Sequence, residues 1–165
     1  MKQKLPLSCV LIHKPTILFL DEPTTGVDPV SRKEFWEMLK RLKSQGITII
    51  VSTPYMDEAT LCDRIALIQN GKILSIDTPE KIIAAYPDKL YAVKAHNMYA
   101  LLNALNSFDK VKNSYAFGEY VHATFIDKTS EGEIIETLET SGLRNIALHP
   151  TAPTIEDCFI KHLSK

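Results

Sequence analysis

Two adjacent carboxylic acids, Asp21 and Glu22, come directly after the apolar residues 17–20. An uninterrupted apolar run is typical of a parallel strand that is covered on both faces, and ligands bind beyond the carboxyl ends of such strands. Asp21 therefore has the position and the chemistry to help hold a hydrated magnesium ion. Glu22 follows on the opposite side of the strand, where a carboxylate can polarise a water molecule as a general base. Taken alone the pattern is weak, because many strands end in acids where the chain returns to water.

The elements that must position these acids are a strand, a helix and a second strand. The first strand is expected over residues 16–22, and a helix over residues 30–44, where apolar side chains recur with helical spacing. Asp28 can cap this helix, and Pro29 suits its first position. Residues 47–51 form a second apolar strand. The order predicts a right-handed crossover in a parallel α/β sheet.

Shorter elements follow this crossover. A helix is expected from Thr53-Pro54 to about residue 62, with the threonine as its cap and the proline in its first turn. Residues 64–69 and 72–76 flank Asn70-Gly71, which is a strong hairpin signal. Thr78-Pro79 begins another helix by the same capping argument.

A domain boundary is expected near residues 86–88, where the long apolar strands give way to shorter elements. Residues 90–148 predict the order strand, helix, strand, strand, helix, strand, which is that of a small ferredoxin-like module. A last helix over residues 154–163 is expected to pack on the body of the protein through three apolar residues spaced four apart, namely Ile155, Phe159 and Leu163.

The composition is that of a globular chain, with 45% hydrophobic and 24% charged residues and a net charge of -1 among its 165 residues. Basic residues are scattered among acids, so no nucleic acid is expected as a partner. No apolar run is long enough to span a membrane. Three widely separated cysteines predict reduced, partly buried thiols, and five histidines without ligand spacing predict surface or packing roles: Cys9, Cys62, Cys158, His13, His96, His122, His149 and His162.

A longer string around the two acids makes the pattern specific. Residues 17–23 (Ile-Leu-Phe-Leu-Asp-Glu-Pro) resemble the Walker B motif of ABC ATPases, and residues 23–29 (Pro-Thr-Thr-Gly-Val-Asp-Pro) resemble the D-loop that follows it. The resemblance implies that Asp21 holds Mg²⁺ through water beside the phosphates of ATP. It implies that Glu22 activates the water that attacks the terminal phosphate. Asp28 would face a second ATPase subunit, in addition to capping its helix.

The resemblance continues after the second strand, with one departure. Residues 51–59 are similar to the switch segment, or H-loop, of ABC ATPases, which usually has a histidine where this chain has Pro54. Proline has neither a side-chain donor nor a backbone N–H. The phosphate contact that the histidine makes in the family would therefore be missing, and Pro54 is a degenerate switch position.

The first residues also matter. Residues 1–5 resemble the end of the ABC signature segment, and Pro6 falls within the helix that should follow it. The 165 residues contain no Gly-x-x-x-x-Gly-Lys-Ser/Thr loop to cradle phosphates. The chain is therefore expected to be a C-terminal fragment that is inactive alone, whether the shortening is natural, a deliberate fragment or a misplaced start.

The remaining residues divide between two domains of this resemblance. Residues 62–66, 70–73 and 78–82 look like the closing elements of the ATPase domain, and residues 153–159 resemble the end of the accessory module of drug- and polymer-exporting ABC subunits. The implied fold is the C-terminal part of a P-loop NTPase sheet over residues 1–86, followed by an α+β ferredoxin-like accessory domain over residues 87–165.

The function implied by the resemblance is that of the ATP-binding subunit of an ABC exporter. Such a subunit would hydrolyse ATP with Mg²⁺, pair with a second ATPase subunit, and lie on the cytoplasmic face of the membrane through transmembrane permease subunits. Two alternatives stay open. One is an ABC-type ATPase that acts on DNA or ribosomes, and the other is a non-enzymatic regulatory or interaction module, which the shortened start and Pro54 favour.

Overall fold

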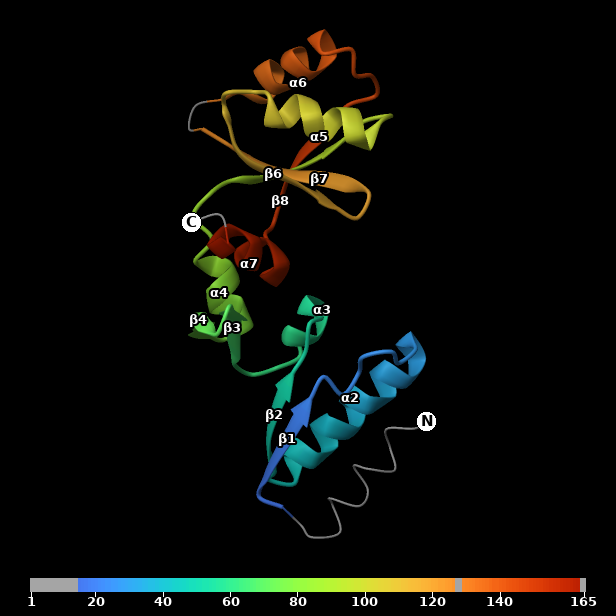
Figure 1. Ribbon diagram of the computed structural model, residues 1–165, viewed down its shortest axis with the longest axis vertical. Coiled ribbons are helices and arrows are strands. Elements are labelled where there is room, and N and C mark those ends of the chain that lie inside the picture. The colour runs from blue at the N-terminus through green and yellow to red at the C-terminus, as the bar shows by residue number, and fades with distance from the viewer. Residues whose placement is uncertain (1–14, 127–128, 164–165) are drawn as a thin grey trace. The chain divides into compact units, whose positions relative to one another are not determined.

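A computed structural model describes residues 15–126 and 129–163, and the chain divides into two compact units, residues 1–82 and 83–165 (Figure 1). The first unit contains the predicted crossover and hairpin, and the second contains a four-stranded sheet. Within the described ranges, none of the helices combines the length and the apolar character needed to cross a membrane.

The first unit begins with strand β1 (Ile17–Asp21), helix α2 (Pro29–Ser44) and strand β2 (Thr48–Ser52), and the two strands are parallel, as predicted. The helix begins where predicted, because the Asp28 carboxylate accepts a hydrogen bond of 3.0 Å from the backbone N–H of Ser31. Its inner side packs on one face of the sheet through a buried apolar cluster: Leu18, Phe35, Trp36, Leu39 and Leu42. One face of the sheet is thereby covered.

The opposite face of this two-stranded sheet is exposed. Phe19 is 72% exposed, Ile17 50% and Ile50 51%, although all three are large apolar residues. The expectation that the first strand is covered on both faces is therefore wrong for the described residues. The physical reason is that α2 can cover only one face, since alternate side chains of a strand point to opposite sides.

The segment after β2 differs from its prediction. Helix α3 (Met56–Ala59) is one turn long and is preceded by Tyr55, so Pro54 lies outside it and Thr53 is not its cap. The Thr53 hydroxyl instead accepts a hydrogen bond of 3.1 Å from the Tyr55 N–H and donates one of 2.6 Å to the Glu58 carboxylate. This local turn competes with the helix and delays its start.

The predicted hairpin and the helix after it are both confirmed. Strands β3 (Ile65–Gln69) and β4 (Lys72–Asp77) are antiparallel. The turn residues Asn70 and Gly71 have positive φ angles of 49° and 71°, as a two-residue type I′ turn requires. Helix α4 (Pro79–Ala84) is preceded by Thr78, whose hydroxyl accepts from the backbone N–H of Lys81 at 3.4 Å.

The second unit has the predicted ferredoxin-like order of elements. These are β5 (Leu90–Lys94), α5 (Met98–Asn106), β6 (Val111–Phe117), β7 (Tyr120–Phe125), α6 (Glu131–Thr140) and β8 (Ala147–Thr151). The strands form an antiparallel sheet in the order β6-β7-β5-β8, and α5 and α6 lie together on one of its faces (Figure 1). Their apolar sides form the core with the inward residues of the central strands: Tyr91, Val93, Leu101, Leu105, Val121, Ala123, Phe125, Ile134 and Leu138.

Helix α7 (Ile155–Leu163) lies on the other face of this sheet (Figure 1), but its contacts differ from the predicted stripe. Ile155 is buried, whereas Leu163 is 47% exposed, so the stripe does not extend to the end of the helix. Asp157 and Cys158 are buried instead. Cys62 and Cys158 form no disulfide and are half-buried and buried respectively, as predicted, whereas Cys9 lies outside the described residues.

A buried polar cluster connects α7 to the sheet. One oxygen of the Asp157 carboxylate lies 2.6 Å from both His122 Nδ1 and the Tyr115 hydroxyl, and the other accepts from the N–H and hydroxyl of Thr154. Burial raises the pKa of Asp157, but these hydrogen bonds outweigh it and leave the pKa below its usual value. The Phe117 ring stacks on His122. His122 is therefore a hydrogen-bonding residue of the interior, which its sequence spacing did not indicate.

Candidate catalytic site at the ends of β1 and β2

The two acids singled out by the sequence lie at the carboxyl ends of the parallel strands. Asp21 is the last residue of β1 and stands opposite Ser52 in the register. The Ser52 hydroxyl donates a hydrogen bond to the Asp21 carboxylate. The backbone N–H of Glu22 lies 3.0 Å from both the carbonyl oxygen and the hydroxyl oxygen of Ser52. Ser52 thus fixes the two strand ends to each other.

Glu22 has an unusual backbone conformation. Its φ of 42° lies in the left-handed region, which residues other than glycine seldom adopt. The hydrogen bonds from its N–H to Ser52 hold this conformation, and the alternation of side chains along the strand ends here. Its exposed carboxylate accepts a hydrogen bond of 3.2 Å from the Thr25 hydroxyl. The carboxylate is therefore oriented by the turn that follows it and is open to water.

The turn between Glu22 and α2 is held by its own backbone. The N–H of Thr25 donates to the carbonyl of Glu22 at 3.2 Å, and the N–H of Val27 donates to that of Thr24 at 3.1 Å. Asp28 ends the turn as the helix cap, and the hydrogen bonds from Ser31 keep the pKa of Asp28 below its usual value. The capping role is thus confirmed. The exposed carboxylate carries a negative charge at neutral pH.

A further carboxylate beside these residues, that of Glu58, was not identified from the sequence. It is only 1% exposed and accepts hydrogen bonds from the hydroxyls of Thr24, at 2.9 Å, and Thr53, at 2.6 Å. Arg32 of α2 approaches it to 3.5 Å and lies over the Tyr55 ring at 4.1 Å. No spacing rule pairs these residues, because they come from four separate elements or turns. In the sequence, Glu58 is only an acid next to an alanine within a short predicted helix.

Pro54 is exposed and follows Ser52 by two residues. The structure therefore places Pro54 in the same segment that binds Asp21 and Glu22 through Ser52. It offers no donor there, because a proline has neither a polar side chain nor an N–H. The sequence match at residues 1–5, and Pro6 with it, lies outside the described residues.

The oxygen atoms at this edge suit one kind of cation. Mg²⁺ prefers hard oxygen ligands and commonly takes one or two carboxylates together with water and substrate phosphates. The carboxylate of Asp21 and the hydroxyl of Ser52 are such atoms and lie side by side. Within residues 15–126 and 129–163, no cluster of three or more His, Cys, Asp or Glu side chains could hold a metal by itself. The oxygen atoms of Asp21 and Ser52 therefore suit a magnesium ion.

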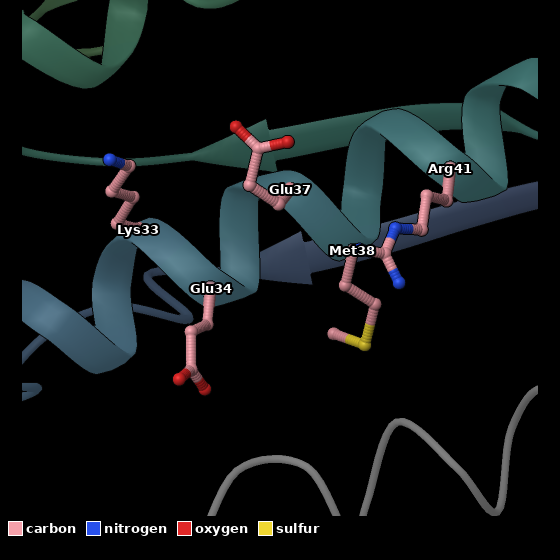
Figure 2. A pocket seen from close by; sticks show the side chains of 5 residues that line it. All are labelled: Lys33, Glu34, Glu37, Met38 and Arg41. Atoms are coloured by element: carbon pink, nitrogen blue, oxygen red, sulfur yellow. The ribbon is translucent and has the colours of Figure 1, made fainter.

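A pocket on the outer side of α2 lies apart from these residues. Figure 2 shows that the side chains lining it all come from that helix: Lys33, Glu34, Glu37, Met38 and Arg41. None of the candidate site residues contributes to it. Its charges are mixed, and it adds nothing to the chemistry at the strand ends.

A parallel strand–helix–strand crossover with two acids at the carboxyl end of its first strand is an arrangement found in P-loop nucleoside triphosphatases. No protein-family model matches the sequence, but it is similar to known ATP-binding proteins of ABC transporters. Over 83 residues, half of this chain, it is 51% identical to a probable multidrug ABC transporter ATP-binding protein, YbhF, of Escherichia coli K12, and covers 14% of that protein.

Two further relatives match 98% of this chain. The daunorubicin resistance ATP-binding protein DrrA2 of Streptomyces coeruleorubidus is 33% identical, with 52% of its length covered. The Nod factor export ATP-binding protein I of Rhizobium sp. N33 is 31% identical, with 51% covered. The solved structure of CbiO1 from Clostridium perfringens, part of the ABC transporter complex CbiONQ, is 33% identical over 48% of this chain and 32% of its own, with a TM-score of 0.44.

The chain is therefore homologous to the ATP-binding proteins of ABC transporters, as the motifs around Asp21 and Glu22 predicted. It spans about half the length of the two relatives that match almost all of it, and a smaller share of YbhF.

Proposed function

We propose that these residues belong to the ATP-binding subunit of an ABC exporter and supply the acids of its hydrolytic site. The observation that carries the proposal is the Asp21-Glu22 pair at the end of β1, held by Ser52 at the end of the neighbouring parallel strand. The homology to ABC ATP-binding proteins supports the same assignment. Residues 1–86 would be the later part of the nucleotide-binding domain and residues 87–165 the accessory domain.

Each site residue has a proposed role. Asp21, with Ser52 beside it, would hold the water shell of Mg²⁺, and the cation would neutralise charge on the phosphates of ATP. Glu22 would accept a proton from the attacking water, since its carboxylate is exposed and oriented by Thr25. Asp28 would face a second ATPase subunit while it caps α2.

Pro54 would leave the site without the donor that a histidine supplies at the switch position. We propose that hydrolysis in the complete subunit is slower for this reason. This observation also favours the second candidate function, a non-enzymatic interaction module that keeps the fold without turnover.

Partners and location follow from the exporter assignment. The relatives are named for multidrug transport, daunorubicin resistance and Nod factor export, and we propose export for this chain by analogy. The subunit would bind transmembrane permease subunits at the cytoplasmic face of the membrane and pair with a second ATPase subunit.

The test uses a completed subunit, in which the 165 residues are joined to an upstream segment of a relative that contains a phosphate-binding loop and a signature segment. We expect this subunit to hydrolyse magnesium-ATP. Glu22→Gln should reduce turnover at least about a hundredfold with ATP affinity unchanged, because the amide keeps the shape of the side chain but cannot accept the proton. Turnover that survives Glu22→Gln would refute the role of Glu22, and ATP binding without any turnover would favour the interaction module.

The 165 residues alone make the complementary test. With no phosphate-binding loop in their sequence, we expect calorimetry to detect no specific binding of magnesium-ATP. Saturable binding at micromolar ATP would show that the nucleotide is held by other groups.

A further inference from the structure

The buried carboxylate of Glu58 lies between the two segments that form the proposed site. A charged group in the interior is costly unless hydrogen bonds or an opposite charge compensate it. Both compensations are present here. A single oxygen, Oε2, accepts from the hydroxyls of Thr24 and Thr53, and Arg32 lies on the side of the other oxygen, Oε1, at 3.5 Å.

The two hydroxyls belong to different parts of the site. Thr24 is fully buried and follows Glu22 by two residues, in the turn that leads to Asp28. Thr53 follows Ser52 and precedes Pro54. The direction of the Thr53 hydroxyl is determined by its partners, since its oxygen accepts from the Tyr55 N–H while its hydrogen is donated to Glu58. One carboxylate oxygen therefore joins the turn after β1 to the switch segment.

Arg32 adds α2 to the same connection. Its guanidinium lies over the Tyr55 ring at 4.1 Å, and its Nε is 3.5 Å from Glu58 Oε1. Neither Arg32 Nε nor Glu58 Oε1 makes a hydrogen bond in the part of the chain that the structure describes. The pair thus compensates charge without a directional bond, whereas the two threonine bonds are directional. The two threonine hydroxyls are therefore the groups that hold the turn after β1 and the segment after β2 in a defined geometry.

We propose that Glu58 is a positioning residue, which keeps the turn carrying Glu22 in a fixed relation to the switch segment at Pro54. A displacement of one segment is passed to the other through the shared oxygen. The catalytic role of Glu22 rests on the proposed function. The connection from Thr24 through Glu58 to Thr53 does not depend on it. The alternative is a buried ion pair that only stabilises the fold, and it predicts no specific communication between Thr53 and the turn.

The connection is tested first on the 165-residue chain by amide hydrogen exchange. Thr53→Val removes the hydroxyl but keeps the shape of the side chain. We expect exchange in the other segment, at the Thr25 and Val27 amides, to become about tenfold faster, comparable to the loss of one hydrogen bond to a charged group. Thr53→Ser, which keeps the hydroxyl, should restore the original rates.

Controls separate this effect from general destabilisation. Thr60→Val removes an exposed hydroxyl from the end of helix α3, which carries Glu58, and should leave exchange at the Thr25 and Val27 amides unchanged. In a Glu58→Ala background, Thr53→Val should cause no further change, because the shared oxygen is gone. Unchanged exchange at Thr25 and Val27 in Thr53→Val, or an equal increase at all amides of the first unit, would overturn the proposal.

The completed subunit tests the catalytic consequence. Thr24→Val and Thr53→Val should each lower kcat about tenfold and change the KM for ATP less than about twofold, and the serine variants should restore kcat. A completed subunit that hydrolyses ATP and loses this activity in Glu22→Gln would establish the proposed function without reference to Glu58. If that holds and the valine variants turn over normally, Glu58 does not position the catalytic acid. If the completed subunit is inactive, the proposed function fails, and the exchange experiment alone decides whether the connection exists.

Discussion

At the scale of single residues, the proposed site depends on short polar contacts between two strand ends. Ser52 binds Asp21 through its hydroxyl and accepts from the N–H of Glu22, so one serine orients both acids. The left-handed backbone of Glu22 turns its carboxylate out of the strand and toward Thr25. Strain of this kind is held by surrounding hydrogen bonds and is common at functional sites.

Pro54 offers a gain-of-function experiment in the completed subunit. Pro54→His should raise turnover, because an imidazole at this position regains a donor to the terminal phosphate. A lost donor of this kind commonly costs about 2.7–4 kcal/mol of barrier, and the gain is limited by whether the turn aims the ring correctly. Pro54→Ala is the matched control. An unchanged rate in Pro54→His, with Glu22→Gln still inactive, would show that another group has the switch role.

The Asp157 cluster predicts a pH dependence for the second unit. The pKa of Asp157 is lowered in the folded chain, so its ionised form stabilises the fold fully above its unfolded pKa of about 3.9. That contribution is lost as the pH falls toward the folded pKa. Asp157→Asn should therefore cost about 1–3 kcal/mol at pH 7, and the difference from wild type should shrink below about pH 4.

Urea unfolding followed by far-ultraviolet circular dichroism measures both effects. Asp109→Asn, an exposed change in the same unit, serves as the control and should change stability little at any pH. A cost for Asp157→Asn that stays constant between pH 3 and pH 7 would contradict the stabilising role of the ionised carboxylate.

At the scale of elements, turns and caps define where the strands and helices begin. The hairpin β3–β4 turns at Asn70-Gly71, where both residues have positive φ. Helix α5 is capped by Asn97, whose side chain accepts from the Ala100 N–H at 3.0 Å. Because such signals act over a few residues, they can be recognised without knowledge of the tertiary structure.

The hairpin turn allows a comparison of one substitution at two glycines. Gly71→Ala should destabilise the first unit by about 1 kcal/mol, because φ is +71° and an added Cβ is strained there even though nothing lies within 4 Å. Gly132→Ala, in helix α6 and equally uncrowded, should stabilise the second unit by up to about 1 kcal/mol. Fluorescence of Trp36, the only tryptophan, reports the first unit, and circular dichroism reports both. Effects of equal sign would contradict the conformational explanation.

At the scale of the whole molecule, the exposed face of the β1–β2 sheet determines how the 165-residue chain behaves in solution. We expect the chain to self-associate through this face, because Ile17, Phe19 and Ile50 form an apolar surface on strands with few neighbours. Phe19→Thr keeps the strand propensity while it removes the largest exposed side chain.

Sedimentation velocity measures this prediction. Phe19→Thr should shift the chain toward the monomer, whereas Tyr99→Ala, which removes an exposed aromatic ring from helix α5, should not. A wild-type chain that stays monomeric at high concentration would show that the apolar face does not drive association.

The sequence alone was sufficient for the order of elements, the Asn70-Gly71 hairpin, the Asp28 cap and the relation to ABC ATP-binding proteins. These features depend on periodicity, on capping residues a few positions apart, or on a continuous motif. Asp21 and Glu22 were singled out as candidate site residues for the same reason, since both lie within one short string at the end of an apolar run.

Only the tertiary structure identified the partners of buried polar groups. Glu58 and His122 look like ordinary residues in the sequence, because their partners lie in segments that meet through strand register and helix packing. The exposure of Phe19 was decided in the same way, since an apolar strand is buried only on the faces that other elements cover. Local patterns specify which elements form, whereas long-range contacts decide which side chains meet.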